Sequence, residues 1–212
     1  MPISIPYRQA VYTISAPKLE LCPTDSVAEV AFIGRSNAGK SSAINALTDQ
    51  NKLARTSKTP GRTQLLNYFT LVPGRYLVDV PGFGYAKVSA SQKQQWQKQL
   101  VRYLEEREPL KGLVMLMDIR HPFMDSDTMM IQWCIKAGIP LRILLTKADK
   151  LAYGASKSAL LQVRKQLKEQ AAQVSVQLFS SLNRQGVDEL KACLDGWLGE
   201  DEAEAGEAAA AE

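Results

Sequence analysis

Residues Val30–Ser42 read VAFIGRSNAGKSS, and the part from Gly34 to Ser41 fits the pattern G-x-x-x-x-G-K-[ST]. The apolar run before this pattern predicts a buried parallel strand, and the small polar residues after it predict the start of a helix. Between them, Gly34 and Gly39 allow the backbone to turn its N–H groups inward, toward a bound anion. The positive end of the helix dipole points to the same place. The segment therefore predicts a phosphate-binding loop.

The loop residues have expected roles in holding a nucleotide. Lys40 would bring a positive charge to the β- and γ-phosphates, and Ser41 would offer its hydroxyl to Mg²⁺. The alternative is a glycine-rich turn with a solvated lysine, although a chance match in a chain of this length has a probability of only about 1%. The predicted loop comprises Gly34, Arg35, Ser36, Asn37, Ala38, Gly39, Lys40 and Ser41.

The length and composition of the chain limit its class. Its 212 residues suit one domain with a full core. The apolar runs are too short to span a membrane, and the N-terminal residues lack a basic start followed by an apolar core, so no signal peptide is predicted. The three cysteines are scattered without metal-ligand spacing, which favours reduced thiols. We expect a cytoplasmic, monomeric protein that does not insert into membranes.

Charge is unevenly distributed along the sequence. The net charge is +4, but residues 200–212 hold six acids and no base. Without this tail, 26 bases face 16 acids, which gives the remainder a charge of +10. A body this basic suggests a polyanionic partner, and a merely solvated basic surface is an equally good reading of the charge alone. The tail has too little apolar bulk to pack and is predicted to be disordered.

Hydrophobic periodicity divides the chain into three parts. Residues 1–26, with four prolines, are expected to be an extended, loop-like extension, residues 27–199 an α/β domain, and residues 200–212 the acidic tail. Strands are predicted at 30–33, 65–72, 76–80, 112–118, 141–145 and 174–179, and helices after residue 41, at 91–106, at 126–137, at 156–172 and around 187–198. The alternation predicts a three-layer α/β domain whose six-stranded sheet is mostly parallel, with one antiparallel strand from the hairpin at 73–74.

Further polar segments follow the predicted strands, at the edge where an α/β sheet binds its ligand. Asp79-Val80-Pro81-Gly82 could hold Mg²⁺ through a water with its carboxylate and touch a γ-phosphate with the glycine N–H, although D-x-x-G alone is common. Thr63 closes a basic loop before a strand and could be the second protein ligand of Mg²⁺. Thr59 is the alternative for that position.

Two segments nearer the C-terminus concern the base of a nucleotide. In Thr146-Lys147-Ala148-Asp149, the Asp149 carboxylate could accept hydrogen bonds from guanine N1–H and N2–H, a donor pair that adenine lacks, and the alkyl stem of Lys147 could lie over the base. By itself, a surface salt bridge is the better reading of Asp149. Ser180-Ser181 ends the last predicted strand, where a backbone N–H could meet guanine O6.

The order of these segments is more specific than any one of them. Phosphate loop, threonine loop, D-x-x-G, [NT]-K-x-D and S-[SA] follow one another as in the guanine-nucleotide-binding switch proteins of the Ras-like, translation-factor-related class. An ATP-binding P-loop kinase or transport ATPase would not need Thr146–Asp149, and a metabolic kinase would need a second-substrate pocket that no feature supplies. His121, the single histidine, has no acid or nucleophile paired with it by spacing, which favours a loop role over catalysis.

The motifs more closely resemble one bacterial family. GRSNAGKSS, SKTPGRTQ, VDVPGFGYA, MDIRHP, LLTKADKL and FSSL, spread over residues 34–182, are similar to the EngB (YihA/YsxC) family of GTPases. The resemblance implies a P-loop GTPase domain, Mg²⁺, assembly of the large ribosomal subunit, and a need for the protein in normal cell division and septation. It assigns Mg²⁺ to Ser41 and Thr63. It assigns GTP to the phosphate loop and to Gly61, Arg62, Thr63, Gln64, Leu65, Asp79, Val80, Pro81, Gly82, Thr146, Lys147, Ala148, Asp149, Phe179, Ser180 and Ser181.

Departures from the general GTPase pattern bear on the reaction. Thr146 stands where asparagine is usual, and its hydroxyl can still reach the phosphate loop. Phe83 stands where Ras-like proteins keep a catalytic glutamine, so hydrolysis is expected to be slow and to depend on Lys40, Thr63 and Gly82. Asn37 resembles the potassium-binding asparagine of some related GTPases, and an equally good reading is that it only stabilises the turn.

The expected partners are GTP or GDP and a large-subunit precursor made of ribosomal RNA and proteins. Between Asp49 and Asp79 there are five bases and no acid. These bases, which could steer the protein to RNA phosphates, are Lys52, Arg55, Lys58, Arg62 and Arg75. The alternative from another class is a GTP-binding scaffold at the division septum that does not act on ribosomes.

Overall fold

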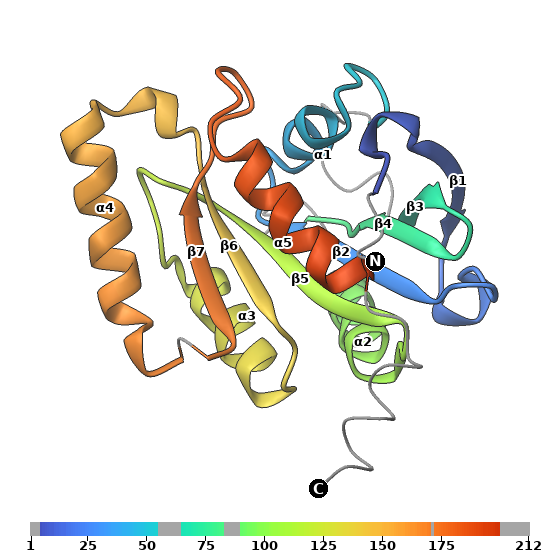
Figure 1. Cartoon of the computed structure of the whole chain (residues 1–212). Coiled ribbons are helices and arrows are strands. Elements are labelled where there is room, and N and C mark those ends of the chain that lie inside the picture. Colours follow the sequence, from blue (N-terminus) through green and yellow to red (C-terminus); the bar gives the residue numbers. More distant parts are fainter. Residues whose placement is uncertain (1–4, 55–64, 83–89, 171, 200–212) are drawn as a thin grey trace, which may run out of the picture.

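A computed structural model describes residues 5–54, 65–82, 90–170 and 172–199 of the chain, and Figure 1 shows their arrangement. A twisted sheet forms the middle layer, with helices on both faces. The helices are α1 (Lys40–Thr48), α2 (Ala90–Glu106), α3 (Asp125–Lys136), α4 (Tyr153–Gln166) and α5 (Val187–Gly199). Short 3-10 helices occur at η1 (Tyr7–Gln9), η2 (Leu19–Leu21), η3 (Ala148–Lys150) and η4 (Lys168–Gln170). The three-layer α/β architecture is confirmed.

The sheet has seven strands in the order β1-β3-β4-β2-β5-β6-β7. They are β1 (Val11–Ala16), β2 (Ala28–Gly34), β3 (Leu66–Val72), β4 (Arg75–Asp79), β5 (Leu110–Asp118), β6 (Leu141–Thr146) and β7 (Val174–Leu178). β4, β2, β5, β6 and β7 pair in parallel, while β3 is antiparallel to both β4 and β1. Within the described part of the chain, β3 is therefore the one strand that runs against the others, as predicted.

The prediction of six strands was wrong, because the segment expected to be loop-like supplies the seventh. Residues Val11–Ala16 form β1 at the edge of the sheet and pair with β3. The prolines that suggested a loop, Pro6 and Pro17, lie just outside this strand and do not interrupt it. Four of its six side chains are exposed, so the strand lacks the strong apolar pattern that marked the others.

Two apolar clusters fill the spaces between the layers. Alternate residues of β2 point to opposite faces, so that Val30 and Phe32 join one cluster and Ala31 and Ile33 join the other. The first cluster packs against α1 and α5, and the second against α2, α3 and α4. In α2, the predicted inward residues Leu100, Tyr103 and Leu104 are buried, whereas the side chain of Trp96 lies outside the described set.

A buried carboxylate shows how the start of β2 is tied to α2. Glu29 is fully buried and accepts hydrogen bonds from the hydroxyls of Tyr103 (2.9 Å) and Tyr68 (3.3 Å). It also forms an ion pair with Arg107, whose Nε lies 3.0 Å from the carboxylate. Because these partners satisfy the charge, Glu29 serves the structure of the domain and is not a candidate for catalysis.

Candidate nucleotide-binding site

The phosphate loop joins the end of β2 to the start of α1, as its sequence context predicted. Two of its residues have left-handed backbone angles, Asn37 with φ of 64° and Gly39 with φ of 97°. Gly34 is required for a different reason, since a Cβ atom there would lie 3.0 Å from the carbonyl oxygen of Leu116 on β5. The loop is thus a tight turn seated against the neighbouring strand, with the first N–H groups of α1 at its open side.

Lys40 and Asp79, predicted from separate motifs, meet in this site. Their side chains form an ion pair and are only 13% and 10% exposed, respectively. Burial lowers the pKa of Lys40 to about 7, so its positive charge depends on a nearby anion. In the structure that anion is Asp79, and in a nucleotide complex phosphate oxygens would take its place. The end of β4 and the start of α1 are therefore linked by this ion pair.

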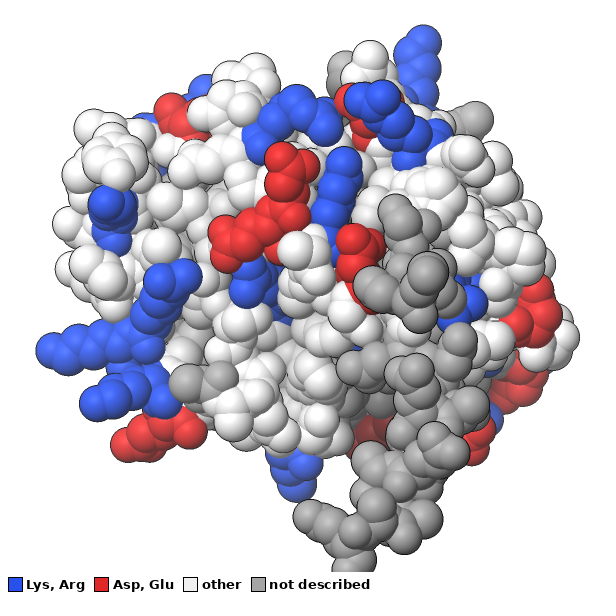
Figure 2. Space-filling model, viewed as in Figure 1, with Lys and Arg blue, Asp and Glu red and all other residues white. Residues whose placement is uncertain are grey.

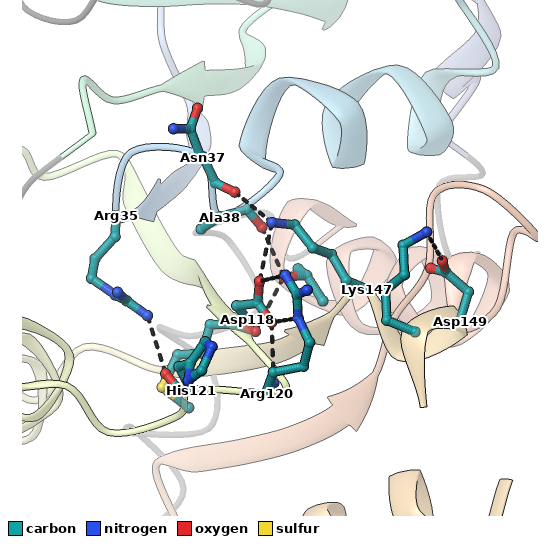
Figure 3. Close-up of polar contacts among 11 residues, drawn as sticks. Arg35, Asn37, Ala38, Asp118, Arg120, His121, Lys147 and Asp149 are labelled. Atoms are coloured by element: carbon teal, nitrogen blue, oxygen red, sulfur yellow. Dashed lines mark hydrogen bonds and ion pairs between the residues drawn. The ribbon is translucent and has the colours of Figure 1, made fainter. Parts of the chain in front are cut away.

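Arg35 has a side chain that points away from the phosphate loop (Figure 3). Its Nε lies 3.2 Å from Oδ1 of Asp127, and its Nη2 donates to the carbonyl oxygen of His121 at 3.1 Å. Asp127 is fully buried, and its other oxygen accepts the N–H of Met124 at the start of α3. Burial raises the pKa of Asp127, and the Arg35 guanidinium opposes that shift. The guanidinium thus anchors the loop to α3, which leaves only the Arg35 backbone to face phosphates.

Thr146 and Lys147 connect the end of β6 to the same loop. The Thr146 hydroxyl donates to the carbonyl oxygen of Ala38 at 2.7 Å, which confirms that threonine can bridge to the loop where asparagine is usual. Lys147 Nζ donates to the carbonyl oxygen of Asn37 at 3.0 Å, as Figure 3 shows. Two direct hydrogen bonds therefore hold the segment predicted to read the base against the phosphate loop.

Asp118 is a site residue that the sequence reasoning did not single out. One of its oxygens lies 3.0 Å from Lys147 Nζ, and Arg120 binds both oxygens at 2.9 and 2.6 Å. These hydrogen bonds from Arg120, together with Lys147, hold the pKa of the Asp118 carboxyl well below its usual range. Asp118 is the last residue of β5. The rule that identified Asp79, a carboxylate at the carboxyl end of a strand, would also have found it.

Asp149 accepts a hydrogen bond from a residue that follows the end of β7. The Ser180 hydroxyl donates to Asp149 Oδ1 at 2.6 Å and, as the first cause, lowers the pKa of that carboxyl. The N–H of Ser180 is itself bonded to the carbonyl oxygen of Gln185 at 3.0 Å. Phe179 is fully buried, and its carbonyl oxygen accepts the N–H of Ala148 at 3.2 Å. The two predicted base segments thus meet, with a role for the Ser180 side chain that the sequence did not suggest.

The predicted magnesium and γ-phosphate residues lie partly within the described chain. Ser41 and Asp79 line one cavity together with Leu65, Pro81 and Gly82. Hydroxyl and carboxylate oxygens beside a phosphate loop suit Mg²⁺, which prefers oxygen ligands and keeps several waters. Thr63, Thr59 and Phe83, with Gly61, Arg62 and Gln64, lie outside the described residues. Within the ranges that the structure covers, no group of three or more His, Cys, Asp and Glu side chains forms an alternative metal site.

Other features agree with a site built only at the ends of the strands. His121 is exposed and contributes its carbonyl oxygen to Arg35, which is a loop role. Cys22 and Cys134 are buried in the core. None of the helices in the described ranges has the length and apolar character needed to cross a membrane.

Comparisons with known proteins show which family the chain resembles. A family model described as a 50S ribosome-binding GTPase matches residues 29–147. The probable GTP-binding protein EngB of Salmonella paratyphi B is 55% identical over 194 residues, which cover 92% of each chain. A crystal structure of a probable GTP-binding protein engB matches with a TM-score of 0.65 at 20% identity, over 81% of this chain and 98% of that one.

A second solved structure, NFeoB from S. thermophilus bound to GDP.AlF4- and K+, matches with a TM-score of 0.56 at 23% identity. That match covers 76% of this chain and 58% of the other. The two structural matches show the α/β P-loop GTPase fold, and the match to the Salmonella protein extends over 92% of the chain. On that evidence, the chain belongs to the EngB family of GTP-binding proteins, within the 50S ribosome-binding GTPases.

Proposed function

We propose that the protein is a GTP-binding, slowly hydrolysing switch that acts in the cytoplasm, as a monomer, on assembly of the large ribosomal subunit. The observation that supports this proposal is the convergence of the predicted phosphate loop and the Asp149 carboxylate at one edge of the sheet. Thr146 on Ala38 and Lys147 on Asn37 join these two parts. A nucleotide bound across this site would have its phosphates at the loop and its base at Asp149. The family's description as ribosome-binding supports the choice of partner.

The described contacts suggest how each part of GTP is held. The N–H groups of the phosphate loop would bind the phosphates, with Lys40 released from Asp79 to neutralise them. Ser41 and Thr63 would hold Mg²⁺, Asp79 would reach the ion through water, and the Gly82 N–H would meet the γ-phosphate. Asp149 would accept the guanine N–H groups. Because the Ser180 N–H is engaged by Gln185, we assign guanine O6 to the N–H of Ser181. The remaining contacts fall to Gly61, Arg62, Gln64, Leu65, Val80, Pro81, Ala148 and Phe179.

Slow hydrolysis is expected from the residue at the position where Ras-like proteins keep a catalytic glutamine. Phe83 has no polar group to orient an attacking water, so the residue offers the nucleophile no help. Mg²⁺ would neutralise charge on the β- and γ-oxygens. Lys40 would stabilise the same charge as it develops, and Thr63 and Gly82 would sense the γ-phosphate and order the two switch segments around it. A partner or a monovalent cation would have to supply the remainder of the rate enhancement.

Potassium is the cation that we propose for this role, with Asn37 as its ligand. Potassium should raise the GTPase rate several-fold over sodium in the wild type, because a bound cation would add positive charge beside the transferred phosphoryl group. The rates can be compared by phosphate release in matched potassium and sodium buffers. The variant to compare with the wild type is Asn37→Ala. It removes the amide and should abolish the difference in GTPase rate between the two salts.

A matched variant separates the amide of Asn37 from its backbone role. Asn37 has a left-handed φ of 64°, which glycine adopts without strain and alanine does not. Asn37→Gly therefore keeps the turn and removes only the amide. If potassium is bound there, both variants lose the potassium effect, while Asn37→Gly keeps normal GDP affinity. Equal rates in both salts for the wild type would contradict the potassium proposal.

The ribosomal role is tested by sedimentation of tagged protein with large-subunit particles. We expect co-sedimentation to be tighter with GTP or a non-hydrolysable analogue than with GDP, because ordering the switch segments lowers the entropy cost of docking. By the family resemblance, depletion should also disturb cell division and septation. Localisation at midcell without any binding to particles would instead support the septum-scaffold alternative.

The basic segment after α1 supplies a direct test of docking. Lys52→Glu combined with Lys58→Glu should weaken particle binding and lower the salt dependence, by about 0.7 to 0.9 in log–log slope for each lost phosphate contact. Nucleotide affinity should stay nearly unchanged. Removal of residues 200–212, which are acidic and could compete for the same surface, should not weaken docking. The measurement is particle binding across a salt series. A double variant that matches the wild type in affinity and slope would show that the segment is only a solvated surface.

A further inference from the structure

The outer face of α4 and η4 carries an uninterrupted row of exposed side chains. Their spacing of three or four residues places them on one side of the helix, opposite the buried Ser156 and Val163. This row, here named the α4 stripe, comprises Tyr153, Lys157, Leu161, Arg164, Lys165 and Lys168. In Figure 2 blue side chains gather at the lower left, where Figure 1 shows the C-terminal end of α4.

The cations of the α4 stripe have no carboxylate partners within the described part of the chain. Lys157 Nζ lies 4.8 Å from the centre of the Tyr153 ring, and Arg164 donates to the carbonyl oxygen of Val176 at 2.9 Å. Lys165 and Lys168 form no ion pair with any residue that the structure places. From Tyr153 to Gln170 the single acid is Glu169, whereas α3 carries two carboxylates and α5 three. The stripe is therefore a local excess of positive charge.

Helix energetics explain only part of this arrangement. Arg164 and Lys165 lie in the last turn, where cations stabilise the helix dipole. Lys157 lies near the start of the helix and gains nothing from that effect. Tyr153 and Leu161 are 71% and 64% exposed on the same face. Contact of apolar side chains with water is unfavourable, so the stability of the helix does not explain their exposure. An aromatic ring and an aliphatic side chain among cations without carboxylate partners suit a ligand with both negative charge and flat or apolar surface.

We infer that the α4 stripe is a docking surface for the phosphate backbone of RNA, with Tyr153 placed to stack on an unpaired base. The stripe is about 20 Å long at ~1.5 Å per helical residue, which is enough to face several successive phosphates. Stacking of aromatic side chains on splayed bases is a common mode of RNA recognition. The inference rests on the proposed ribosomal function for the identity of the RNA.

The position of the stripe separates it from the nucleotide switch. α4 follows directly after Thr146–Asp149, packs against β7, and extends from the edge of the sheet that holds the site to the opposite edge (Figure 1). All of its residues lie in a continuous, described helix and its 3-10 extension, and none belongs to the γ-phosphate-sensing segments. The stripe should therefore contribute equally to RNA binding in the GTP and GDP states, in contrast to Lys52 and Lys58.

The test reverses two charges in the stripe and two elsewhere. Lys165→Glu with Lys168→Glu is compared with Lys18→Glu with Lys191→Glu, and either pair changes the net charge from +4 to 0. Binding to purified large ribosomal subunits and to protein-free large-subunit RNA is measured from about 0.05 to 0.2 M salt. We expect the stripe variant to bind both about tenfold more weakly at 0.15 M, with a log–log slope smaller by about 1.4 to 1.8. The loss of binding in the stripe variant should be the same with a GTP analogue and with GDP. Nucleotide affinity should be normal in both variants.

The possible outcomes separate this inference from the proposed function. If the wild type binds subunits and the stripe variant behaves like its control, the inference is wrong and the ribosomal role stands. Weakened binding to subunits with unchanged binding to protein-free RNA would make the partner a ribosomal protein and overturn the RNA assignment. Stripe-dependent binding to RNA by a protein that does not bind subunits would support the inference against the ribosomal role. Binding to neither would contradict both.

Discussion

Asp149→Asn should weaken GTP and GDP binding by roughly 100- to 1,000-fold and should create affinity for xanthine nucleotides. The carboxylate accepts two hydrogen bonds from guanine in the proposed complex, and charge-assisted bonds of this kind contribute about 1.5 to 3 kcal/mol each. An asparagine amide presents a donor where guanine N2–H₂ needs an acceptor. The same donor suits the O2 atom of xanthine. Titration of fluorescent GDP and XDP analogues into wild type and variant measures both effects.

The surroundings of Asp149 provide graded controls for that experiment. Ser180→Ala removes the hydroxyl that donates to Oδ1 at 2.6 Å, so the carboxylate keeps its charge but loses its orientation. We expect a loss of a few-fold in affinity with guanine preference retained. Lys150 lies 3.6 Å from the other oxygen and is exposed, so Lys150→Ala should have little effect. Unchanged GTP affinity in Asp149→Asn would remove the base assignment of residues 146–149.

Local sequence rules predicted those parts of the site that lie within one segment. The phosphate loop was predicted from its glycines and the flanking strand and helix, and the structure places Gly34, Gly39 and Lys40 accordingly. The strand-end rule brought Asp79 to Lys40 and Ser180 to Asp149, although the pattern did not show which atoms would touch. Motif order supplied the family because the spacing of several segments is far more restrictive than any one of them.

Contacts between distant side chains could not be predicted in the same way. The sequence favoured Arg35 as a phosphate-loop residue without showing that its guanidinium would bind Asp127, which is 92 positions away. Asp118 was passed over because no single-segment motif distinguishes a carboxylate that holds a lysine from one that is solvated. β1 was missed for a related reason. An edge strand with mostly exposed side chains has little hydrophobic periodicity, so its pairing with β3 is decided by the rest of the sheet.

Lys40→Met should reduce GTP affinity and hydrolysis by at least about 100-fold and should also destabilise the nucleotide-free protein. The first effect follows from loss of the cation that we propose neutralises the β- and γ-phosphates. The second follows because Asp79, with a side chain that is 10% exposed, loses its ion-pair partner. An uncompensated charge of this kind costs about 3 to 5 kcal/mol of folding free energy. Thermal and urea unfolding without nucleotide measure the stability, and phosphate release measures the reaction.

Removal of both charges separates the structural effect from the chemical one. Lys40→Met with Asp79→Asn should recover most of the lost stability, because neither buried charge remains, but should recover none of the GTPase activity. A double variant no more stable than Lys40→Met would show that the ion pair does not hold β4 to α1.

Asp79→Asn alone completes the cycle and depends on pH. With Asp79 in place, burial lowers the pKa of Lys40 to about 7, below the value of about 10.4 expected in the unfolded chain, and loss of the Asp79 charge should lower it further. Between these two values the unfolded chain binds more protons than the folded one, so the stability of Asp79→Asn should rise as the pH increases from 7 toward 10. At pH 6 the lysine is buried and without Asp79, and the destabilisation should be largest. A pH-independent difference from the wild type would mean that Lys40 finds another anion when Asp79 is removed.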